Sequence, residues 1–206
     1  MMQIHDCEQG TPAWYECRRG LPTASEFMTV MAKSRDGKTD GATRKTYMLK
    51  LAGEVLTEEL AESYSNVHME RGKAMEAEAR DLYEFLSDDP LTRVGFISNG
   101  QKGCSPDALV GDTGILEIKT ALPHILLGYL LRGEFPAEHR AQTQGALWVC
   151  EREWVDLAVY WPKLPLFVKR AYRDEEYIKN LAAEVDRFNA ELAETVERIR
   201  AMARAA

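Results

Sequence analysis

The spacing of apolar residues changes along this chain of 206 residues, and the change limits the folds open to it. Apolar side chains recur every three or four positions in 47–60 and 75–86, which predicts two amphipathic helices. Short β-branched runs predict strands at 94–97, 108–110, 115–119 and 155–160. Helical spacing also occurs in 139–149 and 174–204. This order predicts an α/β fold, with a small mixed β-sheet flanked by α-helices.

Length and composition favour one domain over 1–206. With 45% hydrophobic residues the chain can bury one sizeable core, and no repeat or low-complexity segment divides it. The motifs described below lie within 10–160, and a C-terminal helix follows at 174–204. We expect the first half of that helix to pack on the core, although an oligomer seam would use the same apolar stripe. No segment resembles a signal peptide or a membrane span, so we expect a cytoplasmic protein.

The four cysteines are scattered and form no C-x-x-C pair; they are Cys7, Cys17, Cys104 and Cys150. Their spacing disfavours a zinc ribbon, a disulfide framework and an iron–sulfur cluster. We therefore expect them to be reduced thiols.

The formal net charge of −7 is unevenly distributed. Residues 54–90 hold eleven acidic and three basic residues, which makes −8. Residues 1–50 hold eight basic and six acidic residues, which makes +2. Contact with nucleic-acid phosphates requires Lys and Arg at the interface, and the N-terminal part of the chain can supply them.

The segment 103–119 brings together the residues with the clearest chemistry. Glu117 and Lys119 are two positions apart on a predicted strand, so both side chains leave the same face. Asp107 precedes Glu117 by ten positions, across a probable hairpin turn at 111–114. Two carboxylates and an ammonium group are therefore expected to converge.

Such oxygen ligands suit Mg²⁺ or Mn²⁺, which bind phosphodiester substrates while keeping water ligands. Taken alone, an E-x-K triplet is weak evidence, since charges alternate on many exposed strands, and Ser-Pro-Asp is ordinary turn chemistry. Together, at this spacing, the two elements form the P-D…E-x-K signature of restriction-endonuclease-like nucleases.

Three further segments extend the resemblance. They are 14–25 (WYECRRGLPTAS), 72–80 (GKAMEAEAR) and 142–148 (QTQGALW). In this order, with the P-D…E-x-K segment, they resemble the blocks of the lambda exonuclease, or YqaJ-type viral recombinase, family. The resemblance covers roughly 10–160 of the chain.

The resemblance implies a metal centre of two Mg²⁺ ions. Asp107 and Glu117 would be ligands together with the carbonyl of Ile118, and Lys119 would be the catalytic lysine. Glu76 would add an acidic group beside the metals. The helical spacing does not choose between Glu76 and its neighbour Glu78, since they flank opposite edges of one apolar stripe.

The resemblance also implies contacts with DNA outside the metal centre. A pocket for the terminal 5′-phosphate would consist of Arg18, Ser25, Ser105 and Gln142. The alternatives are a surface ion pair for Arg18, a helix N-cap for Ser25 and a plain polar helix residue for Gln142. The loop with Lys33, Arg35 and Lys38 would grip duplex DNA, unless it is only a solvated charge run, and Met69 would be a wedge that unstacks the terminal base pair.

Some relatives carry a further acidic residue upstream of Ser105-Pro106-Asp107, where this chain offers only Asn99. The expected function is a Mg²⁺-dependent 5′→3′ exonuclease that degrades one strand of linear double-stranded DNA. It would release mononucleotides and leave a 3′ single-stranded tail. A homotrimeric ring and a phage-type single-strand annealing protein as partner are also implied.

Two alternatives remain open for the function. One is an endonuclease or junction resolvase of the same fold. The other is a catalytically silent DNA-binding module, for which a broken P-D…E-x-K set would be expected.

Overall fold

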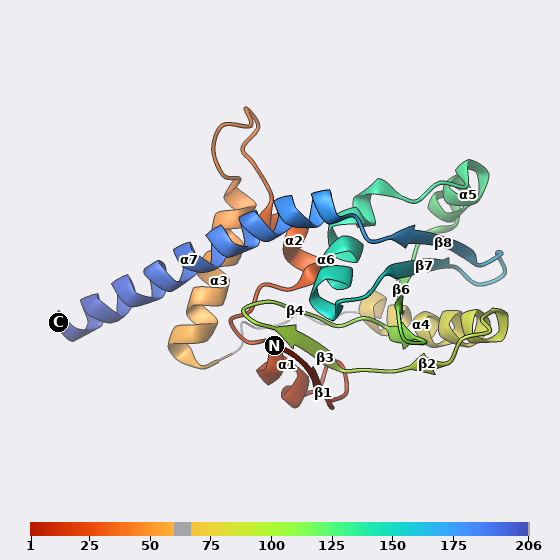
Figure 1. The fold of residues 1–206 in the computed structure, drawn as a ribbon, viewed down its shortest axis with the longest axis horizontal. Helices are drawn as coiled ribbons and strands as arrows, with labels where there is room; N and C mark the ends of the chain where they lie inside the picture. Colours follow the sequence, from red (N-terminus) through yellow and green to blue (C-terminus); the bar gives the residue numbers. More distant parts are fainter. Residues whose placement is uncertain (60–66, 206) are drawn as a thin grey trace.

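A computed structural model describes residues 1–59 and 67–205 of the chain, without the side chains of 67–71 and 73. Figure 1 shows its helices, including two short 3₁₀ helices (η), and its strands. Their bounds are β1 (Met2–His5), α1 (Pro12–Arg18), η1 (Ala24–Glu26), α2 (Phe27–Val30), α3 (Ala42–Thr57), α4 (Val67–Leu86), β2 (Leu91–Thr92), β3 (Phe96–Asn99), β4 (Gly103–Cys104), β5 (Ala108–Val110), β6 (Gly114–Thr120), α5 (Pro123–Arg132), η2 (Ala137–His139), α6 (Arg140–Cys150), β7 (Trp154–Tyr160), β8 (Phe167–Tyr172) and α7 (Glu175–Ala205).

The main sheet has five strands in the order β2-β5-β6-β7-β8. Strands β6 and β7 run parallel, with Glu117 opposite Leu157, and the other neighbours are antiparallel. This confirms the small mixed sheet that the sequence predicts. A second sheet, β1-β3-β4, is not predicted, and the predicted strand at 94–97 begins only at Phe96 and belongs to it.

Helices cover both faces of the main sheet. On one face, α4 packs through Met75, Ala79 and Tyr83 against β6 and β7. On the other face, α6 and α7 pack on Ile115 and Val155, and α5 packs on β7 and β8. Successive strand residues point to opposite faces, so both faces of these central strands are buried.

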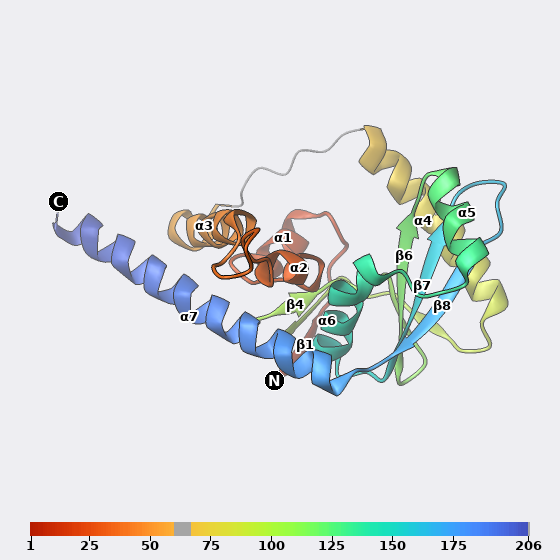
Figure 2. The same ribbon diagram turned by 90° about the horizontal axis from the view of Figure 1, so that it is seen from above.

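Helix α7 has 31 residues. Its buried residues Ile178, Leu181, Val185, Phe188, Leu192 and Val196 continue the predicted apolar stripe. Packing of its first half on the core is therefore confirmed. Further along, Ile199 and Met202 are exposed, and Figure 2 shows the C-terminal turns projecting beyond the rest of the fold.

Helix α5 and strand β8 are not predicted, although α5 has clear boundary signals. Pro123 occupies its first turn, and Gly133 ends it in the left-handed conformation with φ 66°. Among the described residues, no helix combines the length and the apolar character that a bilayer span requires.

Candidate active site

Strands β5 and β6 form the hairpin that the sequence predicts, and this hairpin brings Asp107 beside β6. Val110 pairs with Gly114 across the turn. The backbone N–H of Asp107 donates to the carbonyl of Leu116 at 3.1 Å. Its side-chain Oδ2 accepts a 2.6 Å hydrogen bond from the N–H of Ile118. The Asp107 carboxyl group is thereby held next to Glu117.

Glu117 and Lys119 leave the same face of β6 and form an ion pair. Nζ of Lys119 lies 2.8 Å from Oε1 of Glu117. The same oxygen accepts a hydrogen bond from the Gln142 side-chain amide of α6. Glu117 is only 5% exposed, and these two donors offset part of the cost of burying its charge through contacts with Oε1.

The proximity of the acidic groups changes their protonation. Desolvation, followed by repulsion from Glu117, raises the pKa of Asp107 to about 8, and Glu76 adds to this rise. Desolvation of the Lys119 ammonium works against its charge, but the Glu117 carboxylate outweighs it, so the pKa of Lys119 is raised. In the absence of a further cation, the site therefore keeps a proton on Asp107 near neutral pH.

This arrangement suits a divalent cation. One oxygen of each carboxylate is occupied by a protein donor, and within the described residues no hydrogen bond occupies Oδ1 of Asp107 or Oε2 of Glu117. Positive charge there would relieve the repulsion that raises the pKa of Asp107. No cluster of three or more His, Cys, Asp or Glu in the described part of the chain could hold a metal alone. Mg²⁺ commonly binds through one or two carboxylates and keeps several water ligands, which suits the pair Asp107 and Glu117.

The structure distinguishes between Glu76 and Glu78 of α4. Glu76 lines the same cavity as Asp107 and Glu117. Glu78 faces elsewhere and accepts a 2.8 Å hydrogen bond from the hydroxyl of Tyr160. Of the two, Glu76 alone is available to the site.

Residues of the N-terminal segment, together with Ser105, also line the cavity. The Arg18 guanidinium lies 4.2 Å from the ring centroid of Trp14 and donates at 3.3 Å to Oγ1 of Thr23. That hydroxyl lies 3.2 Å from Oγ of Ser25. Nε1 of Trp14 donates at 2.8 Å to Oγ of Ser105. An arginine and two serine hydroxyl groups are thus presented together, which is suitable for a phosphate group.

The cavity has a volume of about 210 Å³. Its lining includes eight of the residues singled out from the sequence: Arg18, Ser25, Glu76, Ser105, Asp107, Glu117, Lys119 and Gln142, together with Ile118. Gln9 and Thr23 also line it and are not predicted. Thr23 lies in the 14–25 segment, which is the signal that points to it, whereas Gln9 lies outside all the segments.

Close packing brings Gln142 to this cavity. A Cβ atom on Gly145 would lie 2.3 Å from Cδ2 of Phe27, so glycine allows α6 to approach η1 and α2 closely. One turn before Gly145, Gln142 then reaches Glu117. Its contact is with the carboxylate, and its predicted contact with a 5′-phosphate stays a prediction.

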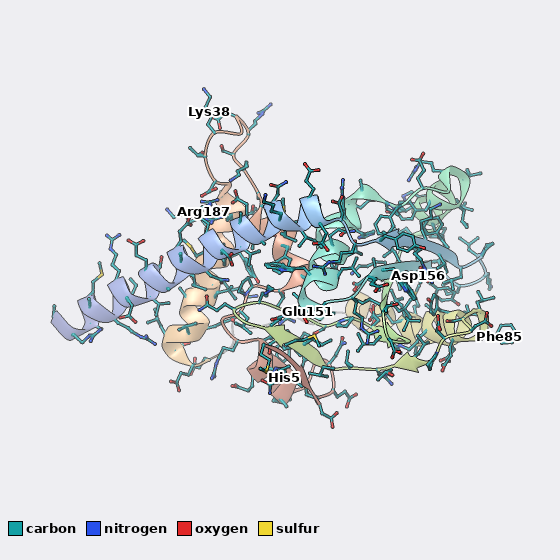
Figure 3. The ribbon with its side chains drawn as sticks, viewed as in Figure 1. His5, Lys38, Phe85, Glu151, Asp156 and Arg187 are labelled. Atoms are coloured by element: carbon teal, nitrogen blue, oxygen red, sulfur yellow. The ribbon has the colours of Figure 1, made fainter. Side chains whose placement is uncertain are left out.

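The basic loop at 33–41 lies apart from the cavity. Figure 3 shows Lys38 at the tip of this protruding loop and Arg187 of α7 at its base. Lys33 pairs with Asp40 at 3.2 Å and with Glu184 of α7 at 3.3 Å, so it contributes to the base of the loop. Within the described residues, the side chains of Arg35 and Lys38 form no ion pair.

Two other predicted positions lie outside the site. The side chain of Met69 is outside the described residues, so its wedge role stays a prediction. Asn99 donates to the carbonyl of Val149 at 3.1 Å and to Glu151 at 3.0 Å, and it does not line the cavity. The four cysteines are free thiols, as the sequence predicts, and Cys104 and Cys150 lie in contact with Sγ atoms 3.3 Å apart.

A mixed sheet whose β5–β6 hairpin presents Asp107 and the Glu117-x-Lys119 pair, with helices on both faces, defines the restriction-endonuclease-like fold class. The chain belongs to the YqaJ-like viral recombinase domain family, whose model matches residues 13–153. None of the curated protein sequences compared with this chain matches it.

Solved structures agree with the family assignment. The chain is 33% identical to LHK-Exo in its complex with dAMP, with a TM-score of 0.85. A second structure, of the alkaline exonuclease LHK-Exo from Laribacter hongkongensis, is 32% identical with a TM-score of 0.84. Both matches cover 95% of this chain and 100% of the other.

A third structure shows the fold at lower similarity. It is a phage related exonuclease from Haemophilus somnus 129PT, which is 15% identical with a TM-score of 0.66. That match covers 87% of this chain and 96% of the other.

The two LHK-Exo structures show that the chain is homologous to an alkaline exonuclease over nearly its whole length.

Proposed function

We propose that this protein is a Mg²⁺-dependent 5′→3′ exonuclease that acts on linear double-stranded DNA. It releases 5′-mononucleotides from one strand and leaves a 3′ single-stranded overhang for recombination by strand annealing. Homology to an alkaline exonuclease supports nuclease activity. The presence of dAMP, a deoxynucleoside monophosphate, in the complex of that relative supports release of mononucleotides.

One observation carries the proposal. A single cavity of about 210 Å³ is lined both by Asp107, Glu117 and Lys119 and by Arg18, Ser25 and Ser105. The first set suits a cation and the scissile phosphodiester, and the second suits a phosphate group. Two phosphate-binding regions in one small cavity favour an enzyme that cuts next to a strand end.

In the catalytic region, Asp107, Glu117 and the carbonyl of Ile118 hold the metal, which we propose to be two Mg²⁺ ions, replaceable by Mn²⁺. When bound, the metal supplies Lewis acidity and a water of lowered pKa. Gln142 and Lys119 orient Glu117 by donating to its Oε1. Because the pKa of Lys119 is raised, its ammonium remains a donor that positions the attacking water and the phosphoryl oxygen.

In the end-binding region, Arg18 donates to the terminal 5′-phosphate, with the hydroxyl groups of Ser25 and Ser105 as further donors. The amide of Gln142, which donates to Glu117, lines the same cavity and is a further donor. Guanidinium groups bind phosphate oxygens with charge-assisted hydrogen bonds, which are stronger than neutral ones. A strand that begins with a 5′-phosphate is therefore placed with its first phosphodiester at the carboxylates.

Duplex DNA is held farther from the cavity. Arg35 and Lys38 contact backbone phosphates, with Lys33 at the base of the loop, and Met69 stacks against the terminal base pair. The family assignment further leads us to propose a homotrimer that encircles the DNA and a phage-type single-strand annealing protein as the partner that receives the 3′ tail.

The test is digestion of end-labelled linear duplex DNA carrying a 5′-phosphate or a 5′-hydroxyl group, beside a covalently closed circle. Each substrate is incubated with Mg²⁺ and with EDTA. We expect mononucleotides from the phosphorylated linear DNA in Mg²⁺ only, with the circle intact. Nicking of the circle would identify an endonuclease instead. Binding without cleavage of any substrate would identify a DNA-binding module.

A further inference from the structure

Helix α4, which carries Glu76, is joined to strand β7 by two tyrosine–carboxylate hydrogen bonds. The hydroxyl of Tyr83 on α4 donates at 2.6 Å to Oδ2 of Asp156 on β7. In the reverse direction, the hydroxyl of Tyr160 on β7 donates at 2.8 Å to Oε2 of Glu78 on α4. None of these four residues lines the catalytic cavity. These bonds connect the helix to the strand that runs beside β6.

Asp156 is a buried acceptor with its own supports. It is 4% exposed, and Figure 3 shows it within the body of the protein. Arg170 on β8 donates from Nε to Oδ1 at 2.9 Å and from a terminal nitrogen to Oδ2 at 2.8 Å. The Arg170 guanidinium in turn lies 3.5 Å from the ring centroid of Trp154. The Asp156 carboxylate is therefore held in one orientation from the strand side.

A buried charge of this kind needs an explanation beyond stability. Replacing a buried ion pair by apolar residues is often neutral or stabilising, so folding alone does not require Asp156 at this position. Directed hydrogen bonds can instead fix a geometry that apolar packing leaves adjustable. Tyr83 remains a donor, because burial and the adjacent Asp156 raise its pKa.

The geometry of α4 connects Tyr83 to Glu76. The two residues are seven positions apart, which is close to two helical turns and about 10 Å along the axis. They therefore lie on nearly the same side of the helix, with Ala79 of the buried stripe between them. A bond that fixes Tyr83 against β7 fixes the rotation of α4 about its axis, and with it the direction of Glu76.

We propose that Tyr83 and Asp156 are positioning residues that direct Glu76 into the metal site. The inference rests on the proposed function, because it assumes that Glu76 acts beside the metal. Loss of the Tyr83–Asp156 hydrogen bond leaves Glu76 present but turned away. This weakens cation binding and slows cleavage, and it leaves the 5′-phosphate region unchanged.

The test is a double-mutant cycle in which titration calorimetry measures Mn²⁺ binding to the full chain without DNA. The variants are Tyr83→Phe, Glu76→Gln and the two combined. Tyr129→Phe is the matched control. Tyr129 lies on α5, away from α4, and the change removes a comparable 2.5 Å hydrogen bond to Glu138. Tyr83→Phe keeps both Arg170–Asp156 bonds, so it is the gentler alternative to Asp156→Asn.

We expect Tyr83→Phe to weaken Mn²⁺ binding about tenfold, the effect usual for residues that orient a metal ligand. It should also lower kcat in Mg²⁺ and leave the KM for DNA unchanged. In the Glu76→Gln background the same change should have no further effect on Mn²⁺ binding, because it acts through Glu76. Tyr129→Phe should bind Mn²⁺ like the wild type.

Additive effects in the double variant would overturn this inference alone, and so would wild-type Mn²⁺ affinity of Tyr83→Phe. Wild-type Mn²⁺ affinity of Glu76→Gln would overturn the role of Glu76 in the proposed function, and this inference with it. An equal loss of Mn²⁺ affinity in Tyr129→Phe would show a general effect of loosened packing and would also overturn the inference.

Discussion

The backbone N–H of Ile118 donates a 2.6 Å hydrogen bond to Oδ2 of Asp107. Ile118 stands between Glu117 and Lys119, so this single bond connects both halves of the P-D…E-x-K signature. It holds the Asp107 carboxyl group in a buried position close to the Glu117 carboxylate. Desolvation, followed by repulsion from Glu117, raises the pKa of Asp107, although the hydrogen bond from Ile118 itself lowers it. A bound cation would reduce the repulsion between the Asp107 and Glu117 carboxylates.

Replacing Lys119 by alanine should lower the cleavage rate in Mg²⁺ at least about 100-fold, the usual contribution of a donor positioned at the reacting group. DNA affinity measured in EDTA should stay within about twofold, because one of several phosphate contacts is removed. Lys169→Ala, on the edge strand β8 of the same sheet, is the matched control and should cleave normally. A parallel loss of binding and cleavage in Lys119→Ala would contradict the catalytic role.

Replacing Arg18 by alanine should remove the preference for a 5′-phosphate over a 5′-hydroxyl end. The loss should be about 10- to 100-fold in kcat/KM on the phosphorylated end, as expected for a charge-assisted hydrogen bond. Arg19→Ala is the control, because Arg19 pairs with Glu16 and with the carbonyl of Glu58. An Arg18→Ala enzyme that still discriminates the two ends would remove Arg18 from the end-binding region.

The raised pKa of Asp107 predicts how stability depends on pH without metal. Between the ordinary value of 3.8 and about 8, the folded protein holds a proton that the unfolded chain has released. Stability therefore falls as the pH rises through this range and levels off above it. Asp107→Asn avoids this loss and should be more stable than the wild type at pH 9 in EDTA, by about 1–3 kcal/mol.

Urea unfolding at pH 5 and at pH 9 measures this effect, and the gain should shrink at pH 5. Asp112→Asn, at the exposed turn between β5 and β6, should show no such pH-dependent gain. In the wild type, Mn²⁺ affinity should rise with pH up to about 8, since the cation displaces the proton. An Asp107→Asn variant that is equally destabilised at both pH values would refute the raised pKa.

The basic loop predicts a graded dependence on salt. Arg35→Ala and Lys38→Ala should each reduce the slope of log affinity for duplex DNA against log salt by about 1, as expected for one phosphate contact. Lys33→Ala should change the slope less, because Lys33 is paired with Asp40 and Glu184. Equal slopes in all three variants and the wild type would show that the loop does not contact DNA.

Local patterns in the sequence were sufficient for several features. The two-residue period placed Glu117 and Lys119 on one face of a strand, and the turn at 111–114 brought Asp107 back beside them. Both follow from backbone geometry over a few residues. The apolar stripe of α7 was equally readable, because helical periodicity over many turns is unambiguous. The P-D…E-x-K core and the α/β class could therefore be predicted.

Other features depended on contacts between distant segments. Helical spacing left Glu76 and Glu78 equivalent. Only the packing of α4 on β7 decided that Glu78 accepts a hydrogen bond from Tyr160 and that Glu76 lines the cavity. The short strand β1 forms only because it pairs with β3. A two-residue or four-residue strand has no pattern strong enough to predict, since its stability comes from its partner.

The sequence by itself determined which chemical groups this protein presents and the order in which they follow one another. The tertiary structure alone decided which of them meet. It joined Gln142 to Glu117 across 25 positions, and Lys33 to Glu184 across 151. The physical reason is range: dihedral preferences and turn chemistry act over a few residues, whereas burial and ion pairing depend on which distant surfaces the core brings together.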